Sequence, residues 1–171
     1  MPPPLQITLP LKPYLKQYLL HSFGEALPLS SSHPISIYIL VCLEGKRHTG
    51  YSLALQQQAL ESFTERYPVI LPPTKLYLNG LVLCPHNVIY INRILDTFFD
   101  QHLYLHTERT RFANQGKRYY GLHRSLRGFL NRYQIEEDVH MNFEALAKRQ
   151  ERFKKNFEKN GFFTSNFVGS Q

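Results

Sequence analysis

The sequence predicts an α+β fold in which a small, strand-rich N-terminal half packs on a helical, helix-turn-helix-like C-terminal half. Three observations lead to this prediction. The chain has 171 residues, 43% of them hydrophobic, and a chain of about 150 residues buries roughly 70% of its unfolded surface. Short apolar runs between prolines precede residue 85, and apolar stripes at helical spacing follow it. We expect one domain over residues 1–161, with halves 1–85 and 86–161, followed by a flexible tail at 162–171.

The first elements are marked by prolines and by local spacing. Apolar residues alternate between prolines over 5–9, which predicts a short edge strand. A helix is predicted over 12–23, because Pro13 suits a first helical turn and Gly24 stops the helix. Residues 27–34 are rich in proline and serine, and we expect a loop there.

The middle of the chain is less regular. Residues 35–43 are rich in β-branched side chains, and a buried strand and a short helix beginning at Pro34 both fit them. Alternation over 51–55 predicts a strand that can run into a helix through 56–66. Short strands are predicted around the Pro72-Pro73 pair and the Asn79-Gly80 turn signal, at 69–71, 76–78 and 81–83.

Apolar stripes at helical spacing predict three helices after Pro85. The first stripe extends over about 20 residues and contains Val88, Ile91, Leu95, Phe98, His102 and Leu105. A break is expected at 114–116. The second stripe contains Leu122, Leu126, Phe129, Leu130 and Tyr133. The third begins after the candidate N-cap Asn142 and contains Phe143, Leu146, Gln150, Phe153 and Phe157.

Composition excludes several classes of protein. An aromatic content of 13% is too high for a disordered chain. The longest apolar run has seven residues, whereas a membrane helix needs about 20. The first residues have neither the basic nor the apolar region of a secretory signal, so we expect a cytoplasmic protein. Its two cysteines, Cys42 and Cys84, are then expected to be reduced and unbridged.

Positive charge is concentrated in the second half of the chain. The net charge is +7, and residues 86–171 contribute +5 of it. Seven basic residues and no acidic residue lie between Arg109 and Arg132. Natural surfaces usually mix the two signs, although a charge run can also be an ordinary solvated helix face. The candidate nucleic-acid-binding residues are Lys117, Arg118, Arg124, Arg127, Asn131, Lys148, Arg149, Arg152, Lys155 and Lys159.

Two basic helices in succession are what a helix-turn-helix presents to DNA, and residues 142–156 would then form the recognition helix. The link over 134–141 departs from the compact motif, because it has eight residues and three acids, whereas the motif uses about three or four residues.

Parts of the chain resemble small uncharacterised proteins of Bacteroidetes phages and mobile elements. The resemblance covers Gly121–Asp138, from Gly-Leu-His-Arg-Ser-Leu-Arg to Glu-Glu-Asp, and then Phe143–Arg149. The opening Leu11–Leu20 is similar to their start as well. The resemblance implies a mobile-element setting and, through the helix-turn-helix look of these proteins, DNA binding. It implies no catalytic residue.

No motif for catalysis or cofactor binding is present, so we expect a protein that is not an enzyme and that binds no cofactor. The patterns GxxxxGK[ST] and GxGxxG are absent. A zinc site made of Cys84, His86, His102 and His106 is less favoured than buried free cysteine and core histidine. Asp96 and Asp100 lie four residues apart and are expected on a solvated helix face.

Two functions remain open. The first is a DNA-binding protein of a phage or mobile element, with duplex DNA as the partner and no contact with a membrane. The second is a structural or assembly protein whose basic face and tail dock on a partner protein, the tail through Phe162, Phe163 and Phe167.

Overall fold

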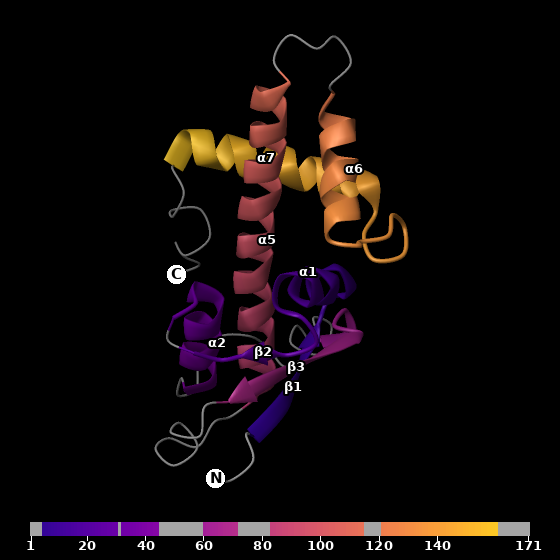
Figure 1. Cartoon of the computed structure of the whole chain (residues 1–171). Helices are drawn as coiled ribbons and strands as arrows, with labels where there is room; N and C mark the ends of the chain where they lie inside the picture. The colour runs from indigo at the N-terminus through magenta and orange to yellow at the C-terminus, as the bar shows by residue number, and fades with distance from the viewer. Residues whose placement is uncertain (1–4, 31, 45–59, 72–82, 115–120, 161–171) are drawn as a thin grey trace. The chain divides into compact units, whose positions relative to one another are not determined.

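The computed structural model describes residues 5–30, 32–44, 60–71, 83–114 and 121–160 (Figure 1). It confirms the predicted α+β class, with a three-stranded sheet in the N-terminal half and helices in the C-terminal half. The chain divides into two compact units, Met1–Asp96 and Thr97–Gln171. The sequence places one change of character after residue 85, whereas the structure divides the chain inside the long helix α5 (Pro85–Ala113).

The sheet of the first unit has the strand order β1-β3-β2. Strand β1 (Leu5–Leu11) is an edge strand, as predicted, and pairs antiparallel with β3 (Glu65–Leu71). Strand β2 (Leu27–Pro28) pairs parallel with β3. The prediction of a loop over 27–34 is therefore wrong at its start, because Leu27 and Pro28 are held by backbone pairing with a segment 42 residues away. The proline and serine content of residues 27–34 cannot predict pairing with a distant strand.

Strand β3 begins earlier than the sequence indicates. The sequence predicts a strand only over 69–71, after a helix that can run through 56–66. Proline is rare inside a central strand. The structure contains Pro68 within β3, opposite Thr8 of β1. Strand β2 pairs only with Val69 and Ile70. Pro68 therefore has a strand neighbour on one side only, and the hydrogen that its nitrogen lacks is not needed there.

Helix α1 (Pro13–Phe23) confirms the prediction for this segment. It has Pro13 at its start and buries Tyr14, Leu15, Tyr18 and Leu19. Gly24 ends it with a φ of 81° and donates its backbone N–H to the carbonyl of Leu20. A positive φ of this size costs glycine little and other residues more.

Helix α2 (Pro34–Glu44) settles the segment for which strand and helix both fitted. His33 Nδ1 accepts a hydrogen bond from the backbone N–H of Ile35 at 3.2 Å, and the carbonyl of His33 accepts from Ile37. These bonds satisfy donors of the first turn. The helix buries Ile35, Ile39, Leu40, Cys42 and Leu43. The predicted elements at 51–55, 76–78 and 81–82 lie outside the described residues.

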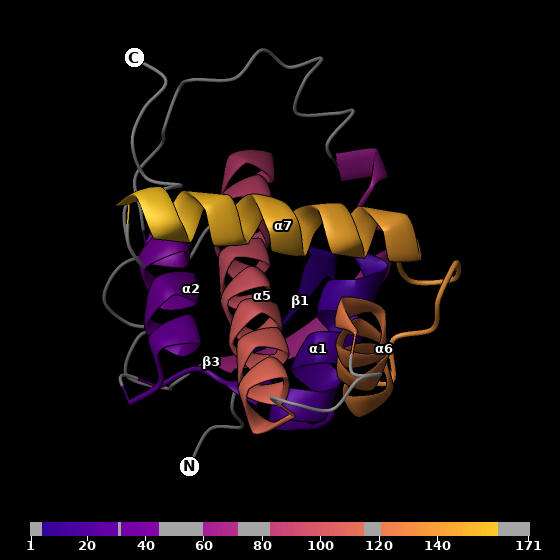
Figure 2. The ribbon, with the colours of Figure 1, turned by 90° about the horizontal axis from the view of Figure 1, so that it is seen from above.

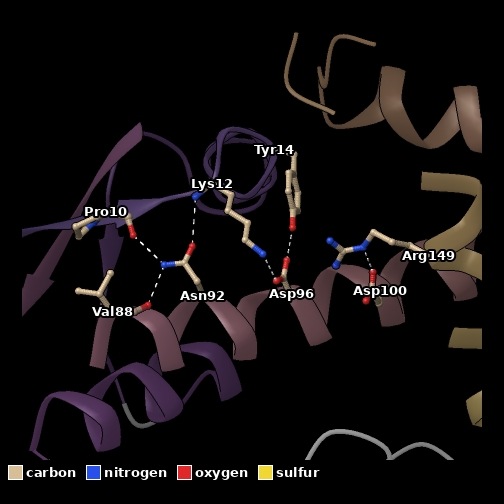
Figure 3. A network of polar contacts seen from close by, with 8 residues as sticks. All are labelled: Pro10, Lys12, Tyr14, Val88, Asn92, Asp96, Asp100 and Arg149. Carbon is tan, nitrogen blue, oxygen red and sulfur yellow. Dashed lines mark hydrogen bonds and ion pairs between the residues drawn. The ribbon is translucent and has the colours of Figure 1, made fainter. Parts of the chain in front are cut away.

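Asn92 joins the beginning of α5 to the first strand and helix within the first unit (Figure 3). Its side-chain amide donates to the carbonyls of Pro10 and Val88, both at 2.9 Å. Its Oδ1 accepts from the backbone N–H of Lys12 at 3.3 Å. Asn92 is 1% exposed. A buried amide is stable only when it is hydrogen-bonded, and three of its bonds are made here.

The apolar stripe of α5 follows the prediction only at first. Val88, Ile91 and Leu95 are buried, but the buried positions then continue as Phe99 and Leu103. The predicted Phe98 is half-buried, and His102 and Leu105 are exposed. At 3.6 residues per turn, a step of four residues advances by about 40° around the helix, whereas the predicted seven-residue spacing drifts back by about 20°. The real stripe advances in steps of four and so changes side relative to the predicted one.

The second unit contains the end of α5, helix α6 (Leu122–Arg132) and helix α7 (Phe143–Asn160). The end of α5 and α6 run side by side, and α7 crosses them, as the two views together show (Figures 1 and 2). The unit buries Phe99, Leu103, Leu126, Phe129, Leu130, Leu146 and Phe153. None of the described helices has both the length and the apolar character that a membrane span requires.

Candidate nucleic-acid interface

Helix α6 presents the clearest cationic surface in the second unit. It buries Leu126, Phe129 and Leu130, as predicted, whereas Leu122 is 44% exposed and does not join the core. Exposed side chains on its other side are Arg124, Arg127 and Asn131, which we call the α6 face. The helix contains no acidic residue between Leu122 and Arg132. The core therefore fixes a helix whose outer side carries positive charge that no acid on the same helix neutralises.

Helix α7 begins where the sequence predicts. Asn142 Oδ1 accepts a hydrogen bond from the backbone N–H of Ala145 at 3.2 Å, which is the contact of an N-cap. Leu146, Gln150 and Phe153 are buried, so Gln150 belongs to the interior. The predicted cationic residues are exposed at Lys148, Arg152, Lys155 and Lys159.

The outer side of α7 is nevertheless less cationic than its lysines and arginines suggest. Exposed glutamates alternate with them at Glu144, Glu151 and Glu158. Lys155 Nζ lies 2.8 Å from Glu151 Oε1, and this contact raises the pKa of Lys155 and lowers that of Glu151. The α6 face is thus the stronger candidate for an anionic partner, although the sequence favours the third helix as the recognition helix.

Arg149 has a different environment from the other candidates. Its Nε lies 2.8 Å from Asp100 Oδ1, and the two side chains are 19% and 20% exposed (Figure 3). Its guanidinium carbon lies 5.4 Å from the centre of the Phe99 ring. The charge of Arg149 is therefore largely neutralised by Asp100 inside the second unit. For this reason we do not include Arg149 in the interface.

The expectation that Asp96 and Asp100 are solvated charges is wrong. Asp100 binds Arg149 in the second unit. In the first unit, Asp96 accepts from Lys12 Nζ at 2.6 Å and also from the hydroxyl of Tyr14 (Figure 3). Spacing along one helix cannot show that a base from a distant segment reaches an acid.

The link between α6 and α7 carries three exposed acids, Glu136, Glu137 and Asp138. His140 Nδ1 accepts from the backbone N–H of Glu136 at 2.9 Å, and the N–H of Asp138 donates to the carbonyl of Met141 at 3.0 Å. Glu137 Oε2 lies 3.8 Å from Arg127 Nε. These acids border one end of the α6 face and limit where a phosphate can approach it.

A cavity of ≈ 690 Å³ lies within the second unit at the beginning of α6. Side chains of α5, α6 and α7 line it, among them Thr107, Ser125, Phe143, Ala147 and Gln150. The sequence analysis placed Gln150 on the apolar stripe of the third helix and gave no sign of this cavity. No local pattern indicates it, because its walls come from three separate helices.

Several predicted features fall outside the described residues. These are the candidate contacts Lys117 and Arg118 and the tail residues Phe162, Phe163 and Phe167. Of the proposed zinc ligands, Cys84 and His86 belong to the first unit, and His102 and His106 to the second. Within the described part of the chain, no three histidine, cysteine or acidic side chains are grouped as metal ligands would be.

Comparison of the chain with protein-family models, with curated proteins and with solved structures found no match. The resemblance to phage and mobile-element proteins therefore stays a prediction.

Proposed function

We propose that the protein binds nucleic acid, duplex DNA in particular, through the α6 face, and that it acts without catalysis. The observation that carries the proposal is the exposure of Arg124 and Arg127 on a helix that has no acidic residue. Arginine contacts phosphate oxygens through two parallel N–H groups and is always charged. The mobile-element setting implied by the sequence resemblance would suit such a protein.

Helix α7 adds a smaller contribution to this interface. Arg152 and Lys159 are exposed, and neither forms an ion pair with another described residue. Each can neutralise one phosphate without first losing an acidic neighbour. Lys155 would have to leave Glu151, and its contribution should be smaller.

The test is the dependence of duplex binding on salt concentration. Each phosphate that is neutralised lowers the logarithm of the affinity by about 0.9 per logarithmic unit of salt. Contacts from Arg124, Arg152 and Lys159, together with Arg127 once it leaves Glu137, should give a slope of about −3.6. Fluorescence anisotropy with a labelled duplex at several salt concentrations measures it.

A matched pair of variants separates a specific face from net charge. Arg127→Gln should reduce the slope by about one and weaken binding to all sequences alike. Arg66→Gln removes the same charge from an exposed position of β3 in the first unit and should change neither value. If Arg127→Gln and Arg152→Gln both bind duplex as the wild type does at about physiological salt, the α6 face is ordinary surface.

A second function, docking on a partner protein, is favoured by apolar side chains at the end of α5. Leu105 is 48% exposed and Phe112 is 74% exposed, and their separation of seven residues places them on one side of the helix. Large exposed apolar groups on one side are typical of interaction surfaces. Binding through them would be insensitive to salt, which distinguishes it from phosphate contacts.

A further inference from the structure

The cavity at the beginning of α6 has the size and composition of a ligand site. Its volume of ≈ 690 Å³ lies within the range of about 300–1,000 Å³ that is usual for small-molecule sites. Such sites combine apolar walls with a few polar groups that fix the orientation of the ligand. The duplex contacts proposed above do not use this cavity.

One part of the cavity wall is apolar and aromatic. It is formed by Leu122, His123, Phe143 and Ala147. The rings of His123 and Phe143 are 5.3 Å apart between centroids, at an interplanar angle of 51°. The guanidinium carbon of Arg127 lies 5.3 Å from the centre of the Phe143 ring. Aromatic rings stack on nucleobases, because every base has a π-face, and a base would use the face of Phe143 that Arg127 leaves open.

The interior of the cavity wall contains two buried polar side chains. Ser125 is 4% exposed, and its Oγ has no hydrogen-bond partner among the described residues. Gln150 is also 4% exposed and donates from Nε2 to Thr107 Oγ1 at 3.3 Å. A buried hydroxyl without a partner destabilises a protein. The arrangement is typical of a site whose ligand supplies the missing hydrogen bond.

The beginning of α6 and Lys148 favour an anion at the cavity. Gly121 is the N-cap of this eleven-residue helix, and glycine has no side chain with which to cap the first turn. The free N–H groups and the dipole of a helix start attract phosphate. Lys148 lines the cavity and is exposed. Three acids line the cavity as well, Glu108, Glu144 and Glu151. Glu108 lies within 4.0 Å of both Arg111 and Lys154, and Glu151 lies 2.8 Å from Lys155, so these bases offset two of the three acidic charges.

From these contacts we infer that the cavity binds a single nucleotide 5′-monophosphate. Its base lies against Phe143 and hydrogen-bonds to Ser125, and its phosphate lies between the start of α6 and Lys148. This inference rests on the proposed nucleic-acid function where the nucleotide belongs to a strand. The same chemistry is offered by a free mononucleotide and by an unpaired nucleotide of a single strand.

The experiment is calorimetric titration of the whole chain with 2′-deoxyadenosine 5′-monophosphate, deoxyadenosine, inorganic phosphate and a single-stranded oligonucleotide. We expect the monophosphate to bind more tightly than phosphate or nucleoside alone. Ala147→Phe fills the cavity and should weaken monophosphate binding at least tenfold. Ala145→Phe adds the same ring at an exposed position of α7 and should change it less than twofold.

Two further variants test the individual contacts. Ser125→Ala should weaken monophosphate binding several-fold while the melting temperature is unchanged or higher, because the hydroxyl has no partner in the free protein. Lys148→Gln should weaken binding of the monophosphate and leave that of deoxyadenosine unchanged. If Ala147→Phe does not fold, the effect of Ser125→Ala on monophosphate binding tests the inference instead. Binding of monophosphate no tighter than that of inorganic phosphate, or equal binding by wild type and Ser125→Ala, would overturn the inference.

Failure of this inference is distinguishable from failure of the proposed function. Ala147→Phe should leave duplex binding and its salt slope unchanged, whereas Arg152→Gln, at an exposed position that does not line the cavity, should lower duplex binding and leave monophosphate binding unchanged. If the single-stranded oligonucleotide binds tightly and the mononucleotide does not bind, the ligand of the cavity is a nucleotide within a single strand. Binding of the mononucleotide without any duplex binding would retain the cavity site and remove the proposed function.

Discussion

Arg149 Nε lies 2.8 Å from Asp100 Oδ1, and this ion pair joins α7 to α5 within the second unit. Both side chains are about four-fifths buried, at 19% and 20% exposure. A carboxylate and a guanidinium that are withdrawn from water depend on each other, because either one alone keeps its desolvation cost without the compensating contact.

Breaking this pair should therefore destabilise the protein. Asp100→Asn and Arg149→Gln should each lower the free energy of unfolding by about 1.5–3 kcal/mol, which is the usual value of a hydrogen bond to a charged group. Urea unfolding of both single variants and the double variant measures the coupling. The double variant should cost much less than the two single changes added together. Additive losses would show that the two residues act independently.

Phe129 is the centre of the interior of the second unit. It is fully buried, and its ring lies 5.3 Å from that of Phe99 and 4.7 Å from that of Tyr133. Phe129→Ala should lower the free energy of unfolding by about 3–5 kcal/mol through lost burial and the cavity left behind. Phe112→Ala, at a side chain that is 74% exposed, should stay within about 0.5 kcal/mol of wild type. Circular dichroism on heating measures the stability of both variants. Similar losses of stability in Phe129→Ala and Phe112→Ala would contradict this packing.

His106 should make stability depend on pH. Burial, helped by the nearby charge of Arg132, lowers the pKa of His106 below its usual 6.5. The unfolded chain then binds a proton at a higher pH than the folded protein does. The free energy of unfolding should consequently fall as the pH drops through about 6.5 and level off below the folded-state pKa.

The variant His106→Gln isolates this effect, because glutamine does not titrate. Urea unfolding of both proteins between pH 8 and pH 5 should give a smaller loss of stability in the variant. The pH dependence that remains reports the other titrating groups. Identical pH dependence in the two proteins would show that His106 is not the group responsible.

Cys42 should be an unreactive thiol in the folded protein. It is 8% exposed, and burial raises its pKa to about 11. The thiolate is the reactive form, so little of it exists at pH 8. Cys84 is only half-buried, and it should be the first to react with a thiol reagent.

Timed alkylation without reductant, followed by mass spectrometry, should show rapid modification of one thiol and modification of the second only after unfolding. Both cysteines should be available in the end, since the structure contains them as free thiols. Equal rates for the two cysteines in the folded protein would contradict the burial of Cys42.

Local patterns were sufficient for the bounds of α1, the start of α7 and part of the buried side of α6. Pro13 and Gly24 bound α1, and Asn142 begins α7, because a cap and a helix stop act within one or two turns of the residue concerned. The apolar spacing in α6 likewise predicts the burial of Leu126 and Phe129. These features depend on residues that are close together in the chain, so the sequence alone is enough to predict them.

Contacts between distant segments were decided only by the packed chain. The pairing of Leu27 and Pro28 with β3, the switch from Phe98 to Phe99 in the α5 stripe, and the ion pair of Arg149 all depend on which surfaces meet. The cavity at Ser125 and the glutamates that weaken the α7 surface are of the same kind. Charge and polarity can be counted along a sequence, but whether a charge faces solvent or a partner is set by packing, because burial determines which interactions water can replace.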